Sequence, residues 1–443
     1  MLLTACGGGS APAPDRAAAP SPLEVVLSEH RGQHTLDAQI RDQQQRITRG
    51  PMRAPDLERL GWLFVTRARE LHDPGAYQLT LQAALAIEAL EPNHRGALLL
   101  RGHALHSVHR FAEAEVIARR LVAERGAPFD HGLLGDVLID RGALDQAIES
   151  YQTMMDQRPD QHAYTRAAHV RYLKGDLTGA LTAMQVAARA ASPRNRDSFA
   201  WTWAKLAGYQ LQSGDAAAAL SSVQRALEVA PNSVHALRAR ASIALAGSGA
   251  QLADALAPLQ TAVALTPHPD LLWMLQEVLE LLGRNEEASA TATQLRAAAS
   301  EDPRAFALYL AAHGQDLAQA ERLARAELNV RPDVYSHEAL ALVLSMQGDH
   351  TRALEHATHS LSTDAADPRL LYHAGVIAQR AGSMAQAHAW LGRAALYDQC
   401  LLPSQRRDLG MRLRSAALQL HLTSSALAAG PSSKKPKKPQ EKP

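Results

Sequence analysis

Residues 133–159 read LLGDVLIDRGALDQAIESYQTMMDQRP, and the spacing of their apolar residues predicts two amphipathic helices joined by a tight turn. Gly142 lies between the helices, where a helix commonly ends in a residue with positive φ. Asp145 is placed to cap the second helix, and Pro159 marks its end. Neither helix can bury its apolar face alone, so we expect the pair to pack against further pairs.

The rest of the chain repeats this unit. Its clearest mark is a glycine followed about five residues later by an alanine, with 32 to 39 residues between successive alanines. An alanine at this place lets two helices approach closely. Asp176, Asp215 and Asp349 directly follow the glycine and are placed to cap the second helix. The series is Gly142/Ala147, Gly175/Ala180, Gly214/Ala219, Gly249/Ala255, Gly283/Ala288, Gly314/Ala320, Gly348/Ala353 and Gly382/Ala387.

The repeating unit resembles the tetratricopeptide repeat, which has a period near 34 residues. The resemblance covers residues 56–400 and implies an all-α, right-handed superhelical solenoid of about ten helix–turn–helix repeats. The longest spacing between successive alanines, from Ala180 to Ala219, comes from additional residues at 191–199. We interpret these residues as a simple loop insertion rather than a contact feature. Two units match the family pattern at five positions, which call in order for a small residue, a glycine, an alanine, a small or aromatic residue, and a proline. These positions hold Gly135, Gly142, Ala147, Tyr151 and Pro159 in one unit, and Ala207, Gly214, Ala219, Ala226 and Pro231 in the other.

The two ends of the chain differ from the array. Residues 1–6 end in Leu3-Thr4-Ala5-Cys6, which resembles a bacterial lipobox after a truncated signal peptide, with Cys6 as the lipidated residue. Residues 7–22 are rich in Gly, Ser, Pro and Ala and are expected to form a disordered linker. The remaining expectations are lead-in helices over 23–55, a capping helix over 401–425 and a disordered Lys/Pro-rich tail over 426–443.

Composition and charge argue against several classes of function. The formal net charge is +1, and residues 434–443 hold five lysines and one glutamate. The remainder is therefore close to neutral and has no concentrated basic face for nucleic acid.

No run of about 18 apolar residues encodes a membrane-spanning helix. Besides Cys6 the sequence has only Cys400, which we interpret as a small buried apolar residue.

No catalytic signature is present, because the sequence lacks HExxH, a P-loop and a G-x-S-x-G elbow. A zinc site needs three or four ligands with supporting carboxylates. We therefore predict no metal and no cofactor, and we expect the histidines to be exposed and polar. An enzyme with a site among the histidines or near residues 191–199 is the alternative. The histidines at helical spacing are His103, His106 and His109, and His356 and His359.

The resemblance implies that the first helix of each unit lines a concave groove that binds partners. Arginine and aromatic side chains often anchor interfaces, so a peptide with acidic groups or a C-terminal carboxylate would fit; the alternative is an ordinary solvated face. The groove residues are Arg166, His169, Tyr172, Trp201 and Lys205 in a basic and aromatic centre, flanked by Asp136, Asp140, Glu277 and Tyr309. A chaperone-type carboxylate clamp is not predicted, because its positions hold Gly132, Leu133, Asp136, Thr165 and His169.

The predicted function is that of a non-catalytic scaffold for protein–protein interaction. We expect protein or peptide partners in the groove, no nucleic acid and no small-molecule substrate. The resemblance to envelope lipoproteins implies a lipid anchor at Cys6 in the bacterial cell envelope, at the outer membrane or the periplasmic face, and a role in the assembly or export of a multiprotein complex. The alternatives are a cytoplasmic adaptor without an anchor and an envelope factor that binds anionic polymer through the lysine tail.

Overall fold

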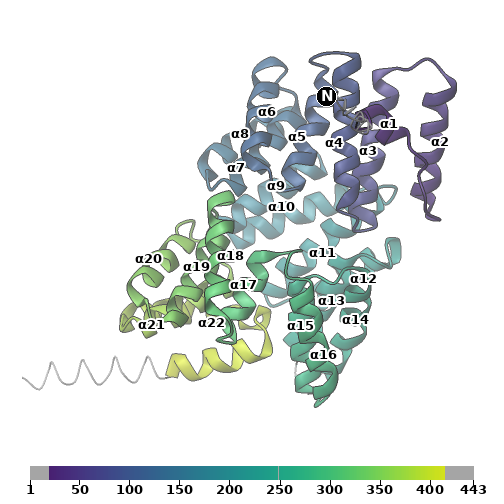
Figure 1. The fold of residues 1–443 in the computed structure, drawn as a ribbon. Helices are drawn as coiled ribbons and strands as arrows, with labels where there is room; N and C mark the ends of the chain where they lie inside the picture. The colour runs from purple at the N-terminus through teal and green to yellow at the C-terminus, as the bar shows by residue number, and fades with distance from the viewer. Residues whose placement is uncertain (1–18, 248, 415–443) are drawn as a thin grey trace, which may run out of the picture.

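The computed structural model describes residues 19–247 and 249–414, and within these ranges every regular element is a helix (Figure 1). Two lead-in helices, α1 (Pro22–Leu27) and α2 (Thr35–Arg49), precede the array, and α1 packs against α4. None of the helices in the described ranges is both long and apolar enough to cross a membrane. Cys6, the linker up to residue 18 and residues 415–443 lie outside the described residues.

Ten antiparallel helix pairs follow in the described part of the chain. The first five are α3 (Ala54–Glu70) with α4 (Gly75–Leu90), α5 (Arg95–Ser107) with α6 (Phe111–Glu124), α7 (Pro128–Asp140) with α8 (Leu144–Gln157), α9 (Gln161–Leu173) with α10 (Leu177–Ala190), and α11 (Arg196–Gln212) with α12 (Ala216–Val229). The others are α13 (Val234–Ala246) with α14 (Leu256–Leu265), α15 (Pro269–Leu281) with α16 (Asn285–Ala297), α17 (Pro303–Ala312) with α18 (Leu317–Val330), α19 (Val334–Gln347) with α20 (His350–Ser360), and α21 (Pro368–Arg380) with α22 (Met384–Ala395).

The pair α7/α8 shows why the recurring residues are needed. Gly142 ends the turn with φ of +72°, a conformation that strains a residue with a side chain. Ala147 is fully buried between the helices. A Cβ on Gly135 would lie 2.2 Å from the ring of Tyr151, so the glycine makes room for the tyrosine. The sequence prediction of an all-α solenoid of helix–turn–helix repeats is confirmed.

The predicted caps are only partly correct. Asp176, Asp215 and Asp349 each accept a hydrogen bond from the backbone amide three residues further along, as expected for N-caps. Asp145 does not cap α8, because the N-cap residue is Ala143. Asp145 lies in the first turn instead, where its negative charge still favours the positive end of the helix dipole.

The longest step between repeats is not the loop insertion that the sequence suggested. Helix α11 has 17 residues, against 13 in α9 and in α13, so most of the additional residues extend the helix by about one turn. Asp197, in this extra turn, forms an ion pair of 2.8 Å with Arg69 at the end of α3. The insertion is therefore a contact feature that ties α11 to the first pair of the array.

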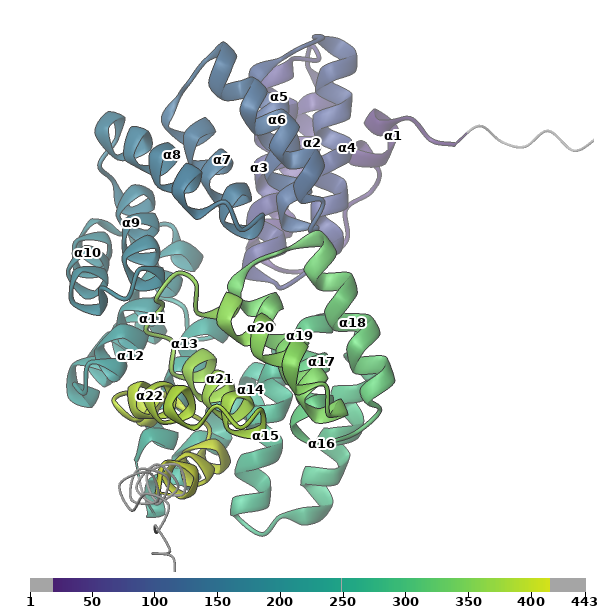
Figure 2. The ribbon, with the colours of Figure 1, turned by 90° about the vertical axis from the view of Figure 1, so that its left-hand side faces the viewer.

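The array curves back on itself, so that units far apart in the sequence touch (Figure 2). A Cβ on Gly142 would lie 2.4 Å from the carbonyl oxygen of Pro332, and a Cβ on Gly175 would lie 2.7 Å from that of Asp364. Arg331 reaches both His109 and Asp140 from the same side. We call this contact the seam. It joins residues 109–111, 139–144 and 169–175 to residues 331–337 and 359–364.

The C-terminal part of the described chain forms a further helix over residues 403–414 that covers the last pair. The hydroxyl of Tyr372 donates to Asp408 at 2.7 Å, and Leu409 is buried. Arg406 donates to the carbonyl oxygens of Leu245 and Ala246, at the end of α13. The helix therefore covers α21 and also ties it to a unit four pairs earlier in the array.

Replacing Gly142 by alanine tests the seam against a matched position. Gly142 and Gly283 have almost the same φ, +72° and +73°, but a Cβ on Gly283 would meet nothing within 4 Å. The left-handed conformation costs each alanine variant about 1–2 kcal/mol. We expect Gly142→Ala to lose clearly more stability than Gly283→Ala in denaturant unfolding, because only its Cβ clashes across the seam. Equal losses would show that the seam contributes nothing to stability.

Candidate functional site

Five of the predicted groove residues meet in one cavity. Helices α7, α9 and α11 surround a space of about 390 Å³, which we call the inner cavity. Asp136, Arg166, His169, Trp201 and Lys205 line it. The cavity is within the size range of ligand-binding pockets, roughly 300–1,000 Å³. Three consecutive units thus contribute to a single site.

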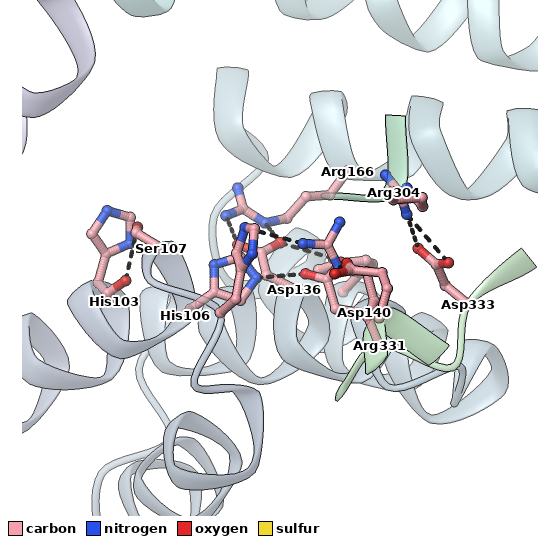
Figure 3. A network of polar contacts seen from close by, with 12 residues as sticks. His103, His106, Ser107, Asp136, Asp140, Arg166, Arg304, Arg331 and Asp333 are labelled. Carbon is pink, nitrogen blue, oxygen red and sulfur yellow. Dashed lines mark hydrogen bonds and ion pairs between the residues drawn. The ribbon is translucent and has the colours of Figure 1, made fainter. Parts of the chain in front are cut away.

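Arg166 and Asp136 form a two-pronged ion pair on the wall of the inner cavity (Figure 3). The Nε of Arg166 donates to Asp136 at 2.8 Å, and the hydroxyl of Tyr151 donates to the same carboxylate at 2.8 Å. Burial alone would raise the pKa of Asp136, but the charge and hydrogen bonds of Arg166 outweigh it and hold that pKa below its usual value. Arg166 is therefore engaged within the protein.

Similar polar pairs connect the first helices of successive units. Their partners lie 29 to 34 residues apart, which is one repeat. Because each charge meets its partner on the neighbouring unit, these pairs neutralise much of the inner face and help to fix the stacking of the repeats. Besides Arg166 with Asp136, the pairs are His106 with Asp140, Arg238 with Asp270, Arg304 with Asp333, and Arg369 with Glu338.

Lys205 differs from these paired residues. Within residues 19–247 and 249–414 its ammonium has no carboxylate within ion-pair distance; it lies 5.6 Å from the ring centre of Trp201. Lys205 lines the inner cavity, and its side chain is exposed to solvent. Its reduced hydration, followed by the nearby charge of Arg238, lowers the pKa of Lys205. A cation over an aromatic ring, facing a cavity, is a suitable anchor for an anionic group.

The histidines of the inner cavity are uncharged at neutral pH. Burial, followed by the charge of Lys205, lowers the pKa of His169 to about 4. Burial, followed by Arg166, also lowers the pKa of His162. The expectation of exposed histidines is wrong here and at His373, which is buried against Glu338. The positive character of the inner cavity therefore comes from Lys205 and not from imidazolium groups.

The other predicted residues lie outside the inner cavity. Tyr172 stacks on Tyr209, which lines it. Asp140 belongs to the seam, where it meets Arg331. Glu277 is 7% exposed and accepts a hydrogen bond from the backbone of Ser404 in the C-terminal helix.

Tyr309 was predicted to be an accessible groove residue, and this prediction is wrong. Its side chain is 2% exposed and its hydroxyl donates to Gln276 of the preceding unit. Sequence reasoning also missed Arg69, which lines the inner cavity. No repeat position marks Arg69, because it approaches the cavity only through its ion pair with Asp197 on α11.

The described residues offer little for catalysis. Among them, no group of three or more His, Cys, Asp or Glu side chains is arranged to hold a metal ion. Burial raises the pKa of the Cys400 thiol to about 12, so this cysteine is not a thiolate at neutral pH. The inner cavity offers two arginines that are paired with carboxylates, one lysine without such a partner among the described residues, one indole ring and several hydrogen-bonding side chains.

Replacing Arg166 by methionine leaves Asp136 without its cation. We expect a loss of about 2 kcal/mol at pH 7 in denaturant unfolding. Because the lowered pKa of Asp136 stabilises the fold only above pH 4, the difference from wild type should shrink as the pH falls below 4. Arg171→Met, on the same helix, breaks an exposed pair with Asp176 and should cost less than about 0.5 kcal/mol. A deficit in Arg166→Met that does not change with pH would contradict this assignment.

Comparisons with known proteins add no function to this description. No family model matches the sequence, and no curated protein matches it. Similar solved structures include the Cut9–Hcn1 hetero-tetramer of the APC/C, with 14% identity over 78% of this chain and a TM-score of 0.42; this chain spans 63% of that one. The human IFIT1 dimer with PPP-AAAA has 12% identity, coverage of 84% of this chain and 93% of that one, and a TM-score of 0.47.

Yeast Tom70 has 12% identity, coverage of 88% of this chain and 96% of that one, and a TM-score of 0.36. At these identities and TM-scores the likeness assigns nothing to this chain. The chain's own features carry the assignment: paired helices, turn glycines with positive φ and fully buried alanines recur along the array. The protein is a solenoid of helix–turn–helix repeats that resemble tetratricopeptide repeats.

Proposed function

We propose that the protein is a non-catalytic scaffold that holds a short segment of a partner protein in the inner cavity. The observation that carries this proposal is Lys205, which lies over Trp201 and faces the cavity while neighbouring charges are paired with one another. A carboxylate of the partner would complete the missing pair. Trp201 and Met184 would contact apolar groups next to that carboxylate.

The size of the inner cavity favours an extended segment over a folded domain. About 390 Å³ accommodates a few side chains, and polar groups from α9 and α11 surround them. The partner is therefore a peptide segment or chain terminus with an acidic group beside an apolar one.

We further propose that Cys6 anchors the protein in a bacterial cell envelope, where it supports the assembly or export of a multiprotein complex. The support comes from the sequence: Leu3-Thr4-Ala5-Cys6 resembles a lipobox, and the Gly/Ser/Pro/Ala-rich residues 7–22 would separate an anchor from the array. A non-specific membrane contact by the lysines of 434–443 would add to such an anchor.

Affinity capture from the native organism tests the binding cavity. We expect Lys205→Glu and Trp201→Ala each to reduce the capture of wild-type partners at least tenfold, because each removes one half of the anchor. Lys174→Glu is a matched charge reversal in the exposed turn after α9, and should keep these partners. Circular dichroism checks that the variants are folded. Equal capture by all four proteins would show that partners bind elsewhere.

The DNA upstream of Met1 tests the anchor separately. We expect an in-frame start codon followed by basic and then apolar codons, which would complete a signal peptide ahead of Cys6. Metabolic labelling with a fatty acid should then mark the wild-type protein and not Cys6→Ser. A stop codon directly upstream, or labelling that persists in Cys6→Ser, would refute the proposed lipid anchor. Neither result would bear on the proposal that the inner cavity binds a partner.

A further inference from the structure

A second cavity lies between the first helices of the last units and the helix over residues 403–414. Its volume is about 340 Å³, and we call it the C-terminal cavity. Side chains from α15, from α17 and the residue after it, from α19 and from α21 line it. It has no lining residue in common with the inner cavity. The molecule therefore has a second enclosed space of a size that suits a ligand.

Helix α15 gives the C-terminal cavity an aromatic ring and two carboxylates. Trp273, Glu277 and Glu280 are spaced four and three residues apart, so they lie on one face of the helix, and all three line the cavity. Among the described residues neither carboxylate has a cation within ion-pair distance, and both accept hydrogen bonds from neutral groups. The backbone amide of Ser404 donates to Glu277, and the side-chain amide of Gln276 donates to Glu280 at 2.8 Å.

The lack of a cation distinguishes these two carboxylates from others on the inner face. Asp333 and Glu338, for example, are each paired with an arginine of a neighbouring unit. Glu277 is 7% exposed, and its burial, with a smaller contribution from the charge of Glu280, raises the pKa of Glu277. A cation in the cavity would offset both the burial of this charge and the repulsion between the two carboxylates.

Two histidines add acceptors to the C-terminal cavity. Nδ1 of His373 donates to Glu338 at 2.7 Å, and Nδ1 of His313 donates to the carbonyl oxygen of Tyr309 at 2.8 Å. In a neutral ring this leaves Nε2 without a proton, so Nε2 is an acceptor. His373 lines the cavity and is 3% exposed, and its Nε2 has no hydrogen-bond partner among the described residues. A buried acceptor is thus available to a ligand with N–H groups.

The arginines of the C-terminal cavity form a separate, basic end. Arg412 is paired with Asp408 on the same helix, and Arg380 is the last residue of α21. The charges that act on Arg380 are those of Arg412 and Asp408, and neither Glu277 nor Glu280 is among them. The arginines therefore leave the carboxylates of α15 without a cationic partner.

We propose that the C-terminal cavity binds a lysine or arginine side chain of a peptide segment, with its cationic group beside Trp273 and the carboxylates of Glu277 and Glu280. An indole ring attracts a cation, and the two carboxylates pair with it. Ammonium and guanidinium groups carry only N–H donors, which matches the acceptors at Nε2 of His313 and His373. This site goes beyond the proposed function and does not depend on what the inner cavity binds.

A titration with N-acetylarginine amide, which has a guanidinium group and no charged terminus, tests the site. We expect the indole NMR signal of Trp273 in the full-length protein, assigned with Trp273→Phe, to shift in a saturable manner. N-acetylcitrulline amide has nearly the same shape but no charge, and should produce no saturable shift. N-acetyl-lysine amide should bind like the arginine probe, because the carboxylates recognise the charge.

Variants locate the binding site for the arginine probe. Glu277→Gln and Glu280→Gln should each weaken its binding by about tenfold, because each removes one carboxylate next to the cation. Glu280 is exposed, so Glu280→Gln keeps the test valid if Glu277→Gln folds poorly. Glu286→Gln removes the same charge from an exposed position at the start of α16 and should bind like wild type. Lys205→Glu should also bind like wild type, whatever its effect on the inner cavity.

A full-length variant with the five lysines of residues 434–443 replaced by glutamine repeats the titration, so that the chain's own ammonium groups cannot compete with the probe. The proposal is refuted if neither this variant nor wild type shows a saturable shift, or if the citrulline probe binds as tightly as the arginine probe. Unchanged affinity in Glu280→Gln and in a folded Glu277→Gln would also refute it. Binding of N-acetylglutamate amide instead, lost in Arg380→Gln, would show that the cavity takes anions.

Discussion

The contact between glycine backbones and distant carbonyl groups determines the shape of the molecule. At Gly142 and Gly175 the turn of a helix pair lies against the carbonyl oxygens of Pro332 and Asp364, with no room for a side chain. The same two glycines have positive φ, so one residue type satisfies both the turn and the close approach. Without that approach the array would be an open superhelix, and Arg331 would not reach His109 and Asp140.

The distribution of charge follows the repeat. Each polar pair on the inner face connects a helix to its counterpart one unit away, so stacking the units also neutralises their charges. A charged side chain that is paired with the neighbouring unit is therefore no longer free to recognise another molecule. Among the described residues Lys205 has no carboxylate partner, because its ammonium lies over the ring of Trp201. Arg166, which has the same charge and lies in the same cavity, is used for stacking.

The sequence was sufficient for what is local or periodic. Turn glycines, buried alanines and the caps at Asp176, Asp215 and Asp349 were predicted, because each acts within one repeat; the exception is Gly249, which begins the 3-10 helix Gly249–Ala255 instead of ending a turn. Contacts between residues 128 to 222 positions apart follow no period, so the seam and the Arg69–Asp197 pair could not be predicted. Five of the predicted groove residues line one cavity, but whether each is paired or unpaired depended on its neighbours in space.

The seam also has a consequence for the order of events during synthesis. Solenoid repeats fold through contacts with their immediate neighbours, so the pairs up to α12 are able to fold as they leave the ribosome. Residues 331–366 and the helix over 403–414 emerge later, and only then does the ring close. The nascent protein therefore passes through an interval in which the inner cavity is formed and the seam is still absent. During that interval His169 lacks the cover of residues 332–335, together with which it lines a cavity at the seam.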